Sequence, residues 1–142
     1  MVPPENPIEQ ALTTYKAAVF AKDLEAFAAL YDQNVHVFDM WGEWSYSGID
    51  AWRKIAANWF NSLGTEKVCV GVVDVQSSSG IDLAVGSAIL TFTAVSEDGK
   101  VLRSLTNRMT LAMRRCGQTW KIVHEHTSAP IDHGTGKVIL RR

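Results

Sequence analysis

The chain has 142 residues, a formal net charge of −1, 46% apolar residues and 20% charged residues. This length suits one domain with a single core, and the near-zero charge lacks the basic surplus that binding to a nucleic-acid backbone requires. No apolar run is long enough to span a bilayer, and the N-terminal residues show no secretory signal. We therefore expect a cytoplasmic domain that binds neither nucleic acid nor membrane.

The first third of the chain is predicted to be helical. Residues 1–6 are expected to form an extended arm ending in Asn6, a good helix N-cap, with Pro7 at the first helical position. From there, apolar side chains recur at helical spacing as far as Val19, and Asp23 is expected to cap a second helix. These two helices are separated by too few residues for anything but a tight corner.

A short strand and a third helix are predicted next. The strand covers residues 35–38, and Asp39 stands at its end. An aromatic and glycine-containing loop over residues 40–48 leads to a strongly amphipathic helix, which Asp50 is expected to cap and Gly64 to stop.

The rest of the chain is predicted to form four long strands joined by tight turns. They cover residues 67–76, 83–95, 101–115 and 119–128. Asp98-Gly99 is the strongest hairpin signal, and the short connections require an antiparallel meander. Helices followed by a meander indicate one α+β domain over residues 7–130 with helices on one face of the sheet. Residues 131–142 remain as a loose tail or an added edge strand.

Tryptophan and cysteine usage gives two further predictions. Four of the five tryptophans lie close together in the sequence: Trp41, Trp44, Trp52 and Trp59. Such a group indicates an aromatic-lined cavity or an interface. Cys69 and Cys116 match no metal or redox spacing, and we expect two free, mostly buried thiols.

Two side chains are candidates for acid–base chemistry. Asp39 adjoins the aromatic loop, and an apolar pocket would raise the pKa of its carboxyl toward the range of a general base. A solvated aspartate at the end of a strand is the simpler alternative. Tyr15 lies on the apolar stripe of the first helix. In a pocket its hydroxyl can donate a hydrogen bond to a developing oxyanion. The alternative is a core tyrosine whose hydroxyl contacts water.

The last strand carries the remaining polar candidates. His124 and His126 share one face of the strand but would need a third ligand to hold a metal ion, so structural histidines are favoured and no metal site or cofactor is predicted. Glu125 occupies the opposite face, where it could pair with Arg108 of the neighbouring strand. Periodicity alone does not decide which face of this sheet is the inner one.

Several local strings occur in a characteristic order. They are Tyr15-Lys16-Ala17-Ala18, Val37-Phe38-Asp39, Ser47-Gly48-Ile49-Asp50-Ala51-Trp52 and the run from Trp120 to Pro130. In this order they resemble the NTF2-like superfamily, particularly its SnoaL-like and ketosteroid-isomerase-like branches. The resemblance implies a cone in which a curved antiparallel sheet wraps around helices and encloses a deep pocket. It also implies a homodimer formed through the outer face of the sheet.

The resemblance assigns roles to the acid–base candidates. Tyr15 falls on the tyrosine that serves ketosteroid isomerases as an oxyanion donor, and Asp39 falls on their proton-shuttling aspartate. The second oxyanion acid of those enzymes has no counterpart, because the matching strand offers Arg108, Thr110 and Ala112. Steroid isomerisation itself is therefore not expected.

The same resemblance implies which side chains line the pocket. They are Trp41, Trp44, Trp52, Arg108, Thr110, Glu125 and Thr127. It places His124 and His126 on the outside of the sheet, as structural or interface residues.

The functional prediction is a cofactor-independent protein that binds a small apolar, cyclic or polyketide-like molecule. Asp39 would be the general base of an isomerase, cyclase, dehydratase or hydrolase, with Tyr15 as hydrogen-bond donor. The alternative is a non-catalytic module that binds a small acid or oligomerises, as in the association domain of calcium/calmodulin-dependent kinase, which the run 120–130 also resembles. Arg108 would then hold the acid. A third alternative is a structural dimer whose cavity is filled by Trp41, Trp44 and Trp52.

Overall fold

The computed structural model describes residues 6–142, so the predicted arm over residues 1–6 lies almost entirely outside the described residues. Within this range the helices are α1 (Pro7–Ala21), α2 (Leu24–Ala28) and α3 (Ile49–Ser62). The strands are β1 (Tyr31–Phe38), β2 (Tyr46–Ser47), β3 (Lys67–Ser79), β4 (Leu83–Val95), β5 (Val101–Cys116) and β6 (Thr119–Ser128). None of the described helices is both long and apolar enough to cross a membrane.

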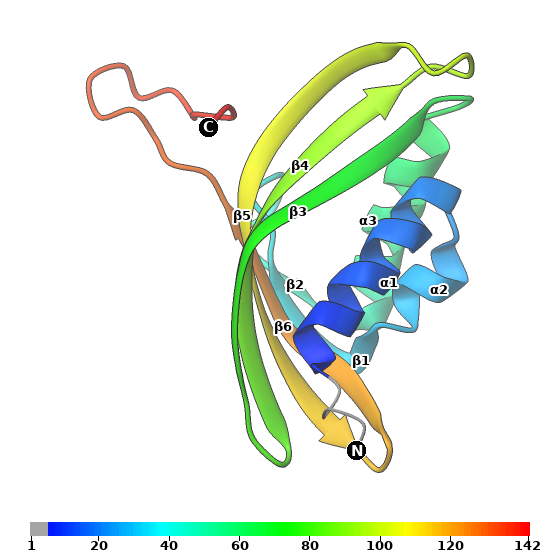
Figure 1. Ribbon diagram of the computed structural model, residues 1–142, viewed down its shortest axis with the longest axis vertical. Coiled ribbons are helices and arrows are strands. Elements are labelled where there is room, and N and C mark those ends of the chain that lie inside the picture. Colours follow the sequence, from blue (N-terminus) through cyan, green and yellow to red (C-terminus); the bar gives the residue numbers. More distant parts are fainter. Residues whose placement is uncertain (1–5) are drawn as a thin grey trace.

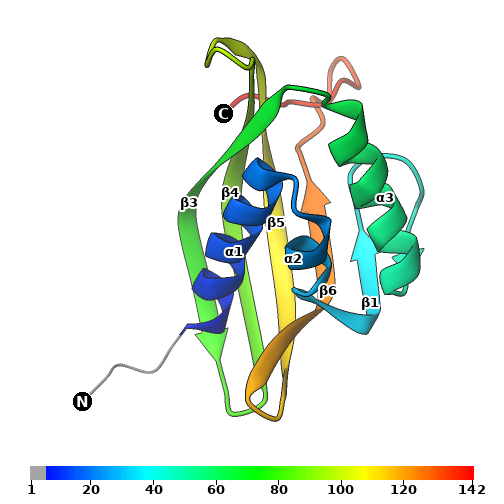
Figure 2. The same ribbon diagram turned by 90° about the vertical axis from the view of Figure 1, so that its right-hand side faces the viewer.

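All six strands belong to one strongly curved sheet with the order β2-β1-β6-β5-β4-β3. Strands β3 to β6 form the predicted antiparallel meander, whereas β1 runs parallel to β6. The three helices lie on the concave side of the sheet (Figure 1), and Figure 2 looks onto them from that side. This α+β cone is the fold that the sequence predicted.

The starts of the helices follow local side-chain chemistry. The Asn6 side chain accepts hydrogen bonds from the backbone N–H groups of Ile8 and Glu9, and Asp23 accepts one from Ala26. The third cap differs from the prediction, because α3 begins directly after Gly48, which adopts a φ of +87°. Asp50 lies in the first turn instead, where its charge still favours the positive end of the helix dipole.

The core forms where α1 packs against the inner face of the meander. Ile8, Leu12 and Val19 of α1 are buried, as is Leu90 of β4. Gly86 allows the helix to approach this closely, because a Cβ atom at that position would overlap the side chain of Ile8.

The two cysteines lie outside this core. Both are free, as expected, but both are exposed, because Cys69 is on the outer side of β3 and Cys116 ends β5 at a turn. The prediction of buried thiols is wrong.

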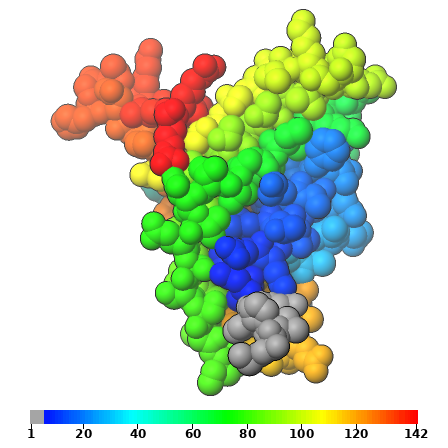
Figure 3. All heavy atoms as spheres, in the orientation of Figure 1, coloured from blue at the N-terminus to red at the C-terminus, as the bar shows by residue number. Residues whose placement is uncertain are grey.

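The C-terminal tail folds back along β5 instead of adding a strand. Its structure over residues 131–142 holds one isolated bridge, between Ile131 and Val138. The N–H of Thr106 donates to the carbonyl of Leu140 at 2.7 Å, at a part of β5 beyond the end of its pairing with β6. In Figure 3 the tail lies beyond β5 and away from α1, where its Leu140 carbonyl pairs with an N–H of β5 that β6 does not reach.

Candidate functional site

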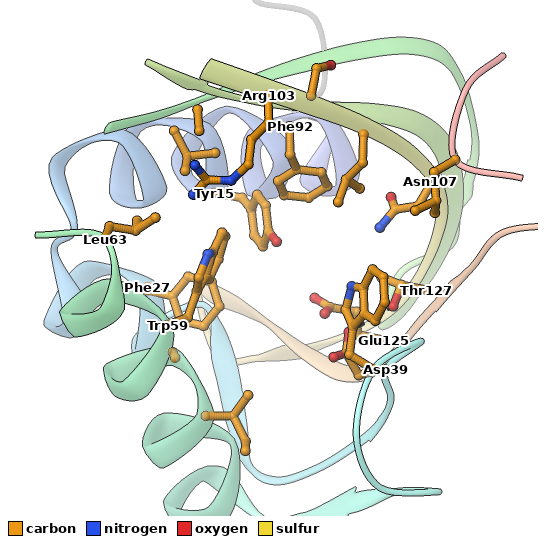
Figure 4. A pocket seen from close by; sticks show the side chains of 18 of the residues that line it. Tyr15, Phe27, Asp39, Trp59, Leu63, Phe92, Arg103, Asn107, Glu125 and Thr127 are labelled. Carbon is orange, nitrogen blue, oxygen red and sulfur yellow. Dashed lines mark hydrogen bonds between the residues drawn. The ribbon is translucent and has the colours of Figure 1, made fainter. Parts of the chain in front are cut away.

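A cavity of about 500 Å³ lies between the concave face of the sheet and the helices (Figure 4). Its wall is mainly aromatic and aliphatic, and includes Tyr15, Phe27, Trp52, Trp59 and Phe92. Six polar side chains interrupt this wall: Asp39, Arg103, Ser104, Asn107, Glu125 and Thr127. A mostly apolar cavity of this size with a few polar groups is typical of a site for a small molecule.

Asp39 is positioned by the parallel pairing of β1 with β6. Val37 pairs with Glu125 and Phe38 pairs with His126, so the chain leaves β1 beside Thr127. The Thr127 hydroxyl donates to Asp39 Oδ1 at 2.9 Å and accepts the N–H of Met40 at 3.0 Å. Burial raises the pKa of the Asp39 carboxyl, while hydrogen bonds from Thr127 and from the backbone of the following loop oppose the rise.

Glu125 is a second carboxyl in the same part of the wall, and it is only 1% exposed. The Tyr31 hydroxyl donates to its Oε1 at 2.6 Å. Burial raises the pKa of Glu125 to about 7, the hydrogen bond from Tyr31 lowers it, and the nearby charge of Asp39 raises it further. None of the ion pairs among residues 6–142 includes Glu125.

Tyr15 extends from α1 into the middle of the cavity, with its hydroxyl directed at the open space (Figure 4). Its ring packs against Phe27 and Phe92, at centroid distances of 5.5 and 6.4 Å. Burial, followed by the charges of Glu125 and Asp39, raises the pKa of Tyr15 well above its usual value. The phenol is therefore neutral at physiological pH and can act as a hydrogen-bond donor. The fold thus brings Tyr15, Asp39, Glu125 and Thr127 into one cavity.

Comparison with known families identifies the domain that holds this cavity. Residues 8–132 match the SnoaL-like domain. The chain belongs to the SnoaL-like family. No curated protein matches it.

Solved structures with the same fold include several NTF2-like proteins. An NTF2-like protein of unknown function from Pseudomonas putida KT2440 is 23% identical, with a TM-score of 0.81 over 95% of this chain and 92% of the other. A nuclear transport factor 2-like superfamily protein from Salmonella enterica serovar Typhimurium is 21% identical, with a TM-score of 0.69 over 93% and 94%. A candidate calcium/calmodulin-dependent protein kinase II association domain from Xanthomonas campestris is 17% identical, with a TM-score of 0.74 over 92% of each chain. These likenesses show the NTF2-like fold.

Two predicted pocket residues of this SnoaL-like domain lie on the wrong face of the sheet. Arg108 and Thr110 are exposed on the outer side of β5, and Arg108 Nε donates to Ser128 Oγ at 3.0 Å. Paired residues on adjacent strands point to the same face, and Thr127 pairs with Met109 while Glu125 pairs with Leu111. The odd-numbered residues of this part of β5 therefore face inward. The predicted contact of Arg108 with Glu125 is wrong for the same reason.

The predicted tryptophans divide between the cavity and the solvent. Trp41 and Trp52 line the cavity, and Trp59 of the same group lines it too. Trp44 is 96% exposed and lies outside the lining, so its prediction is wrong. The loop after β1 turns at Gly42, with φ +79°, two residues before Trp44. Because the cavity is open, the structure does not support a dimer whose pocket is filled by tryptophan.

The histidines of β6 lie outside the cavity, as the resemblance implied. His124 Nδ1 is 2.7 Å from the carbonyl oxygen of His36, and its ring packs edge-on against Phe38. His126 is exposed on the same outer face. Within residues 6–142, no group of three or more histidine, cysteine, aspartate or glutamate side chains is arranged to hold a metal ion.

Three polar residues of the site were missed by the sequence analysis. Tyr31 holds Glu125, and Arg103 lines the cavity while pairing with Glu66 at 2.7 Å. Asn107 is buried in the wall, and its Oδ1 atom has no hydrogen-bond partner among the described residues. The signal for Asn107 was available, because it is the one polar residue in the apolar alternation from Leu105 to Met113.

Proposed function

We propose that this SnoaL-like domain binds a small apolar, cyclic or polyketide-like molecule in the cavity and acts on it without a cofactor. The reaction would be an isomerisation, cyclisation, dehydration or hydrolysis. Asp39 would be the general base and Tyr15 the hydrogen-bond donor. One observation supports this most directly: a partly buried carboxylate and a neutral phenol share one mainly apolar cavity.

The chemistry follows from the charge that each group can carry. The carboxylate of Asp39, with its pKa raised by burial, can remove a proton from a carbon next to a carbonyl or from a water molecule. Tyr15 can then stabilise negative charge that develops on the substrate oxygen. The indole N–H of Trp52 and Asn107 Oδ1 are buried without hydrogen-bond partners among the described residues, so they can bind polar atoms of the ligand.

A ligand screen followed by turnover measurements tests this proposal. Thermal-shift measurements with steroids, polyketides and small aromatic acids are expected to find apolar cyclic ligands that raise the melting temperature. Each hit is then incubated with the protein and analysed for products by mass spectrometry. Asp39→Asn should retain binding while turnover falls by about 10²–10⁴-fold. Arg108→Gln, on the outer face, is the control and should turn over normally. Turnover that survives Asp39→Asn would show that Asp39 is not the base.

A second candidate function is a non-catalytic module that binds a small acid. It is supported by Arg103, whose guanidinium reaches the cavity although Glu66 pairs with it. Small carboxylic acids would then stabilise the wild-type protein without being converted. Arg103→Gln should abolish that stabilisation, and Arg108→Gln should not, because Arg108 lies outside the cavity.

We also propose that two copies of the chain associate through the outer face of the sheet. Apolar side chains exposed there, including Val73 and Val85, support an interface, as do Phe38 and the neighbouring histidines. Sedimentation velocity should give the mass of a dimer, and Val85→Glu should yield monomers. A wild-type protein that sediments as a monomer at all concentrations would contradict this assembly.

A further inference from the structure

The charged side chains that line the cavity are separated by sign. Among residues 6–142, Arg103 is the one cation in the lining, and the carboxyl groups in it belong to Asp39 and Glu125. Figure 4 shows Arg103 on one side of the open space and the two carboxyl groups on the other, with Tyr15 between them. A negatively charged group on a ligand is therefore attracted to one end of the cavity and repelled from the other.

Arg103 belongs to an ion pair at the edge of the cavity. It extends from β5, where it pairs with Ala94 of β4, which also lines the cavity. Its Nη2 is 2.7 Å from Oε1 of Glu66, in the segment that joins α3 to β3. The Glu66 N–H donates to the carbonyl of Leu63, another lining residue, at 2.9 Å. The ion pair thus connects the sheet to the segment that follows α3.

The backbone of that segment is held independently of the ion pair. Lys22 Nζ donates to the carbonyl oxygens of Gly64 and Glu66, at 2.7 and 2.9 Å. The segment therefore keeps its position when the Glu66 side chain turns away from Arg103. Lys22 also adds a second positive charge beside Glu66, so this end of the cavity attracts anions even while Glu66 is present.

The ion pair itself is easily exchanged. The side chains of Arg103 and Glu66 are 60% and 29% exposed, and water screens such pairs so that each contributes little to stability. A ligand carboxylate whose ring is already bound in the cavity has a high local concentration beside Arg103. The planar guanidinium can bind that carboxylate through two parallel N–H donors. Glu66 thus occupies an anion site that a ligand can take over.

We propose that the cavity takes an apolar cyclic molecule that carries a carboxylate, and that Arg103 releases Glu66 to bind this group. The inference rests on the proposed function and names its substrate class, a cyclic carboxylic acid. The ring would fill the aromatic middle of the cavity, and the carboxylate would lie at the end away from Asp39. Arg103 is then a specificity-determining residue that fixes which part of the ring faces Asp39 and Tyr15. Glu66 competes with the ligand for Arg103.

Two probes of the same shape test the proposal: 2-naphthoic acid, which is ionised at neutral pH, and its neutral amide, 2-naphthamide. Isothermal titration calorimetry with the intact protein measures both dissociation constants at about pH 7.5. The wild-type protein should bind 2-naphthoate about 10-fold more tightly than 2-naphthamide, because only the carboxylate forms charged hydrogen bonds with Arg103. Arg103→Gln should remove this preference and leave the affinity for 2-naphthamide within about 2-fold of wild type.

Glu66→Gln separates competition from simple attraction. Removal of the internal carboxylate frees Arg103, so 2-naphthoate should bind about 2–5-fold more tightly than to wild type, while 2-naphthamide should bind unchanged. Glu25→Gln is the matched control, because Glu25 forms an exposed ion pair with Arg53 and neither residue lines the cavity. It should leave both affinities at their wild-type values.

The outcomes distinguish this inference from the proposed function. A wild-type protein that binds both probes equally, or an Arg103→Gln protein that keeps the preference, would overturn the role of Arg103 while apolar cyclic binding stands. An unchanged affinity of Glu66→Gln for 2-naphthoate would overturn the exchange of Glu66 for the ligand. A wild-type protein that binds neither probe would contradict the proposed function as well.

Discussion

The inner and outer faces of β5 and β6 carry similar polar residues in opposite environments. On the inner face, Thr127 binds Asp39, and Glu125 binds Tyr31. On the outer face, Thr110 is exposed and Arg108 donates a hydrogen bond to the hydroxyl of Ser128. The two sets of residues lie on neighbouring strands of one sheet, so the difference between them arises from their direction and not from their position in the chain.

This contrast shows that polar residues on the two faces of the sheet differ in what they contact: protein partners on the inner face and water on the outer face. Water satisfies the outer polar groups, so each contributes little and can be exchanged at little cost. The inner groups depend on one or two protein partners, and those partners set both their hydrogen bonding and their protonation. We therefore expect substitutions on the inner face to change stability and pH dependence, and equivalent substitutions outside to change neither.

The largest expected effect is the pH dependence that Glu125 confers on stability. Its pKa is about 7 in the folded protein, whereas the ordinary value for a glutamate exposed to water is 4.5. Between these values the folded chain holds a proton that the unfolded chain has lost, so stability falls as the pH rises and then levels off above about 7. Relative to Glu125→Gln, the wild-type protein should lose about 3 kcal/mol across this window.

Chemical denaturation at about pH 5 and about pH 8 measures this difference. Glu97→Gln is the matched control, because Glu97 is exposed in the turn between β4 and β5 and should leave the pH dependence of the wild type unchanged. If wild type and Glu125→Gln lost stability in parallel between the two pH values, Glu125 would be ionised in the fold. The inner and outer faces would then differ in how tightly their side chains are packed but not in the protonation of Glu125.

The fold could be predicted from the sequence because local signals mark its boundaries. Asn6, Asp23 and the Asp98-Gly99 turn act within a few residues, and the predicted bounds of β4 and β6 are those observed. Strand β1 is longer than predicted because its first residues are held by neighbours far along the chain, with Tyr31 opposite Ile122 of β6. Such pairing leaves no local pattern to detect. No local pattern marks the position of the tail either, because its hydrogen bond joins Leu140 to Thr106, which is distant in the sequence.

The site was only partly predictable because alternation does not reveal which side is inside. Along β5 one set of side chains is mostly apolar and the other mixed, and the resemblance assigned the mixed set to the pocket. Burial selected the apolar set instead, which brought Asn107 into the cavity and left Arg108 outside. The placement of Tyr15 and Asp39 in the cavity came from the resemblance, and their catalytic roles stay predictions.

Thr127 and Thr110 give a direct test of the two faces with one residue type. Thr127→Val removes both the donor to Asp39 and the acceptor of the Met40 N–H, at a cost of about 1–2 kcal/mol. The pKa of Asp39 should also rise further, because one hydrogen bond that favours its charged form is lost. Denaturation and an NMR titration of the Asp39 carboxyl measure the two effects. Thr110→Val should stay within about 0.5 kcal/mol of wild type. Equal losses of stability in Thr127→Val and Thr110→Val would mean that the face of the sheet does not determine the effect of the substitution.

The smallest expected effect concerns the tail, which lies outside the sheet yet contributes to the cavity. Leu140 lines the cavity and its carbonyl accepts the N–H of Thr106, while Arg142 forms an exposed ion pair with Asp74. Removing residues 140–142 should lower the free energy of unfolding by about 1 kcal/mol or less, because one backbone hydrogen bond and little buried area are lost. It should also speed the dissociation of an apolar cyclic ligand found in the thermal-shift screen, measured by NMR line shapes. Arg142→Ala, which removes only the ion pair, should leave dissociation unchanged. If truncation leaves dissociation unchanged too, Leu140 does not hold the ligand. The contacts that hold it would then come from the inner face of the sheet and the helices, without the tail.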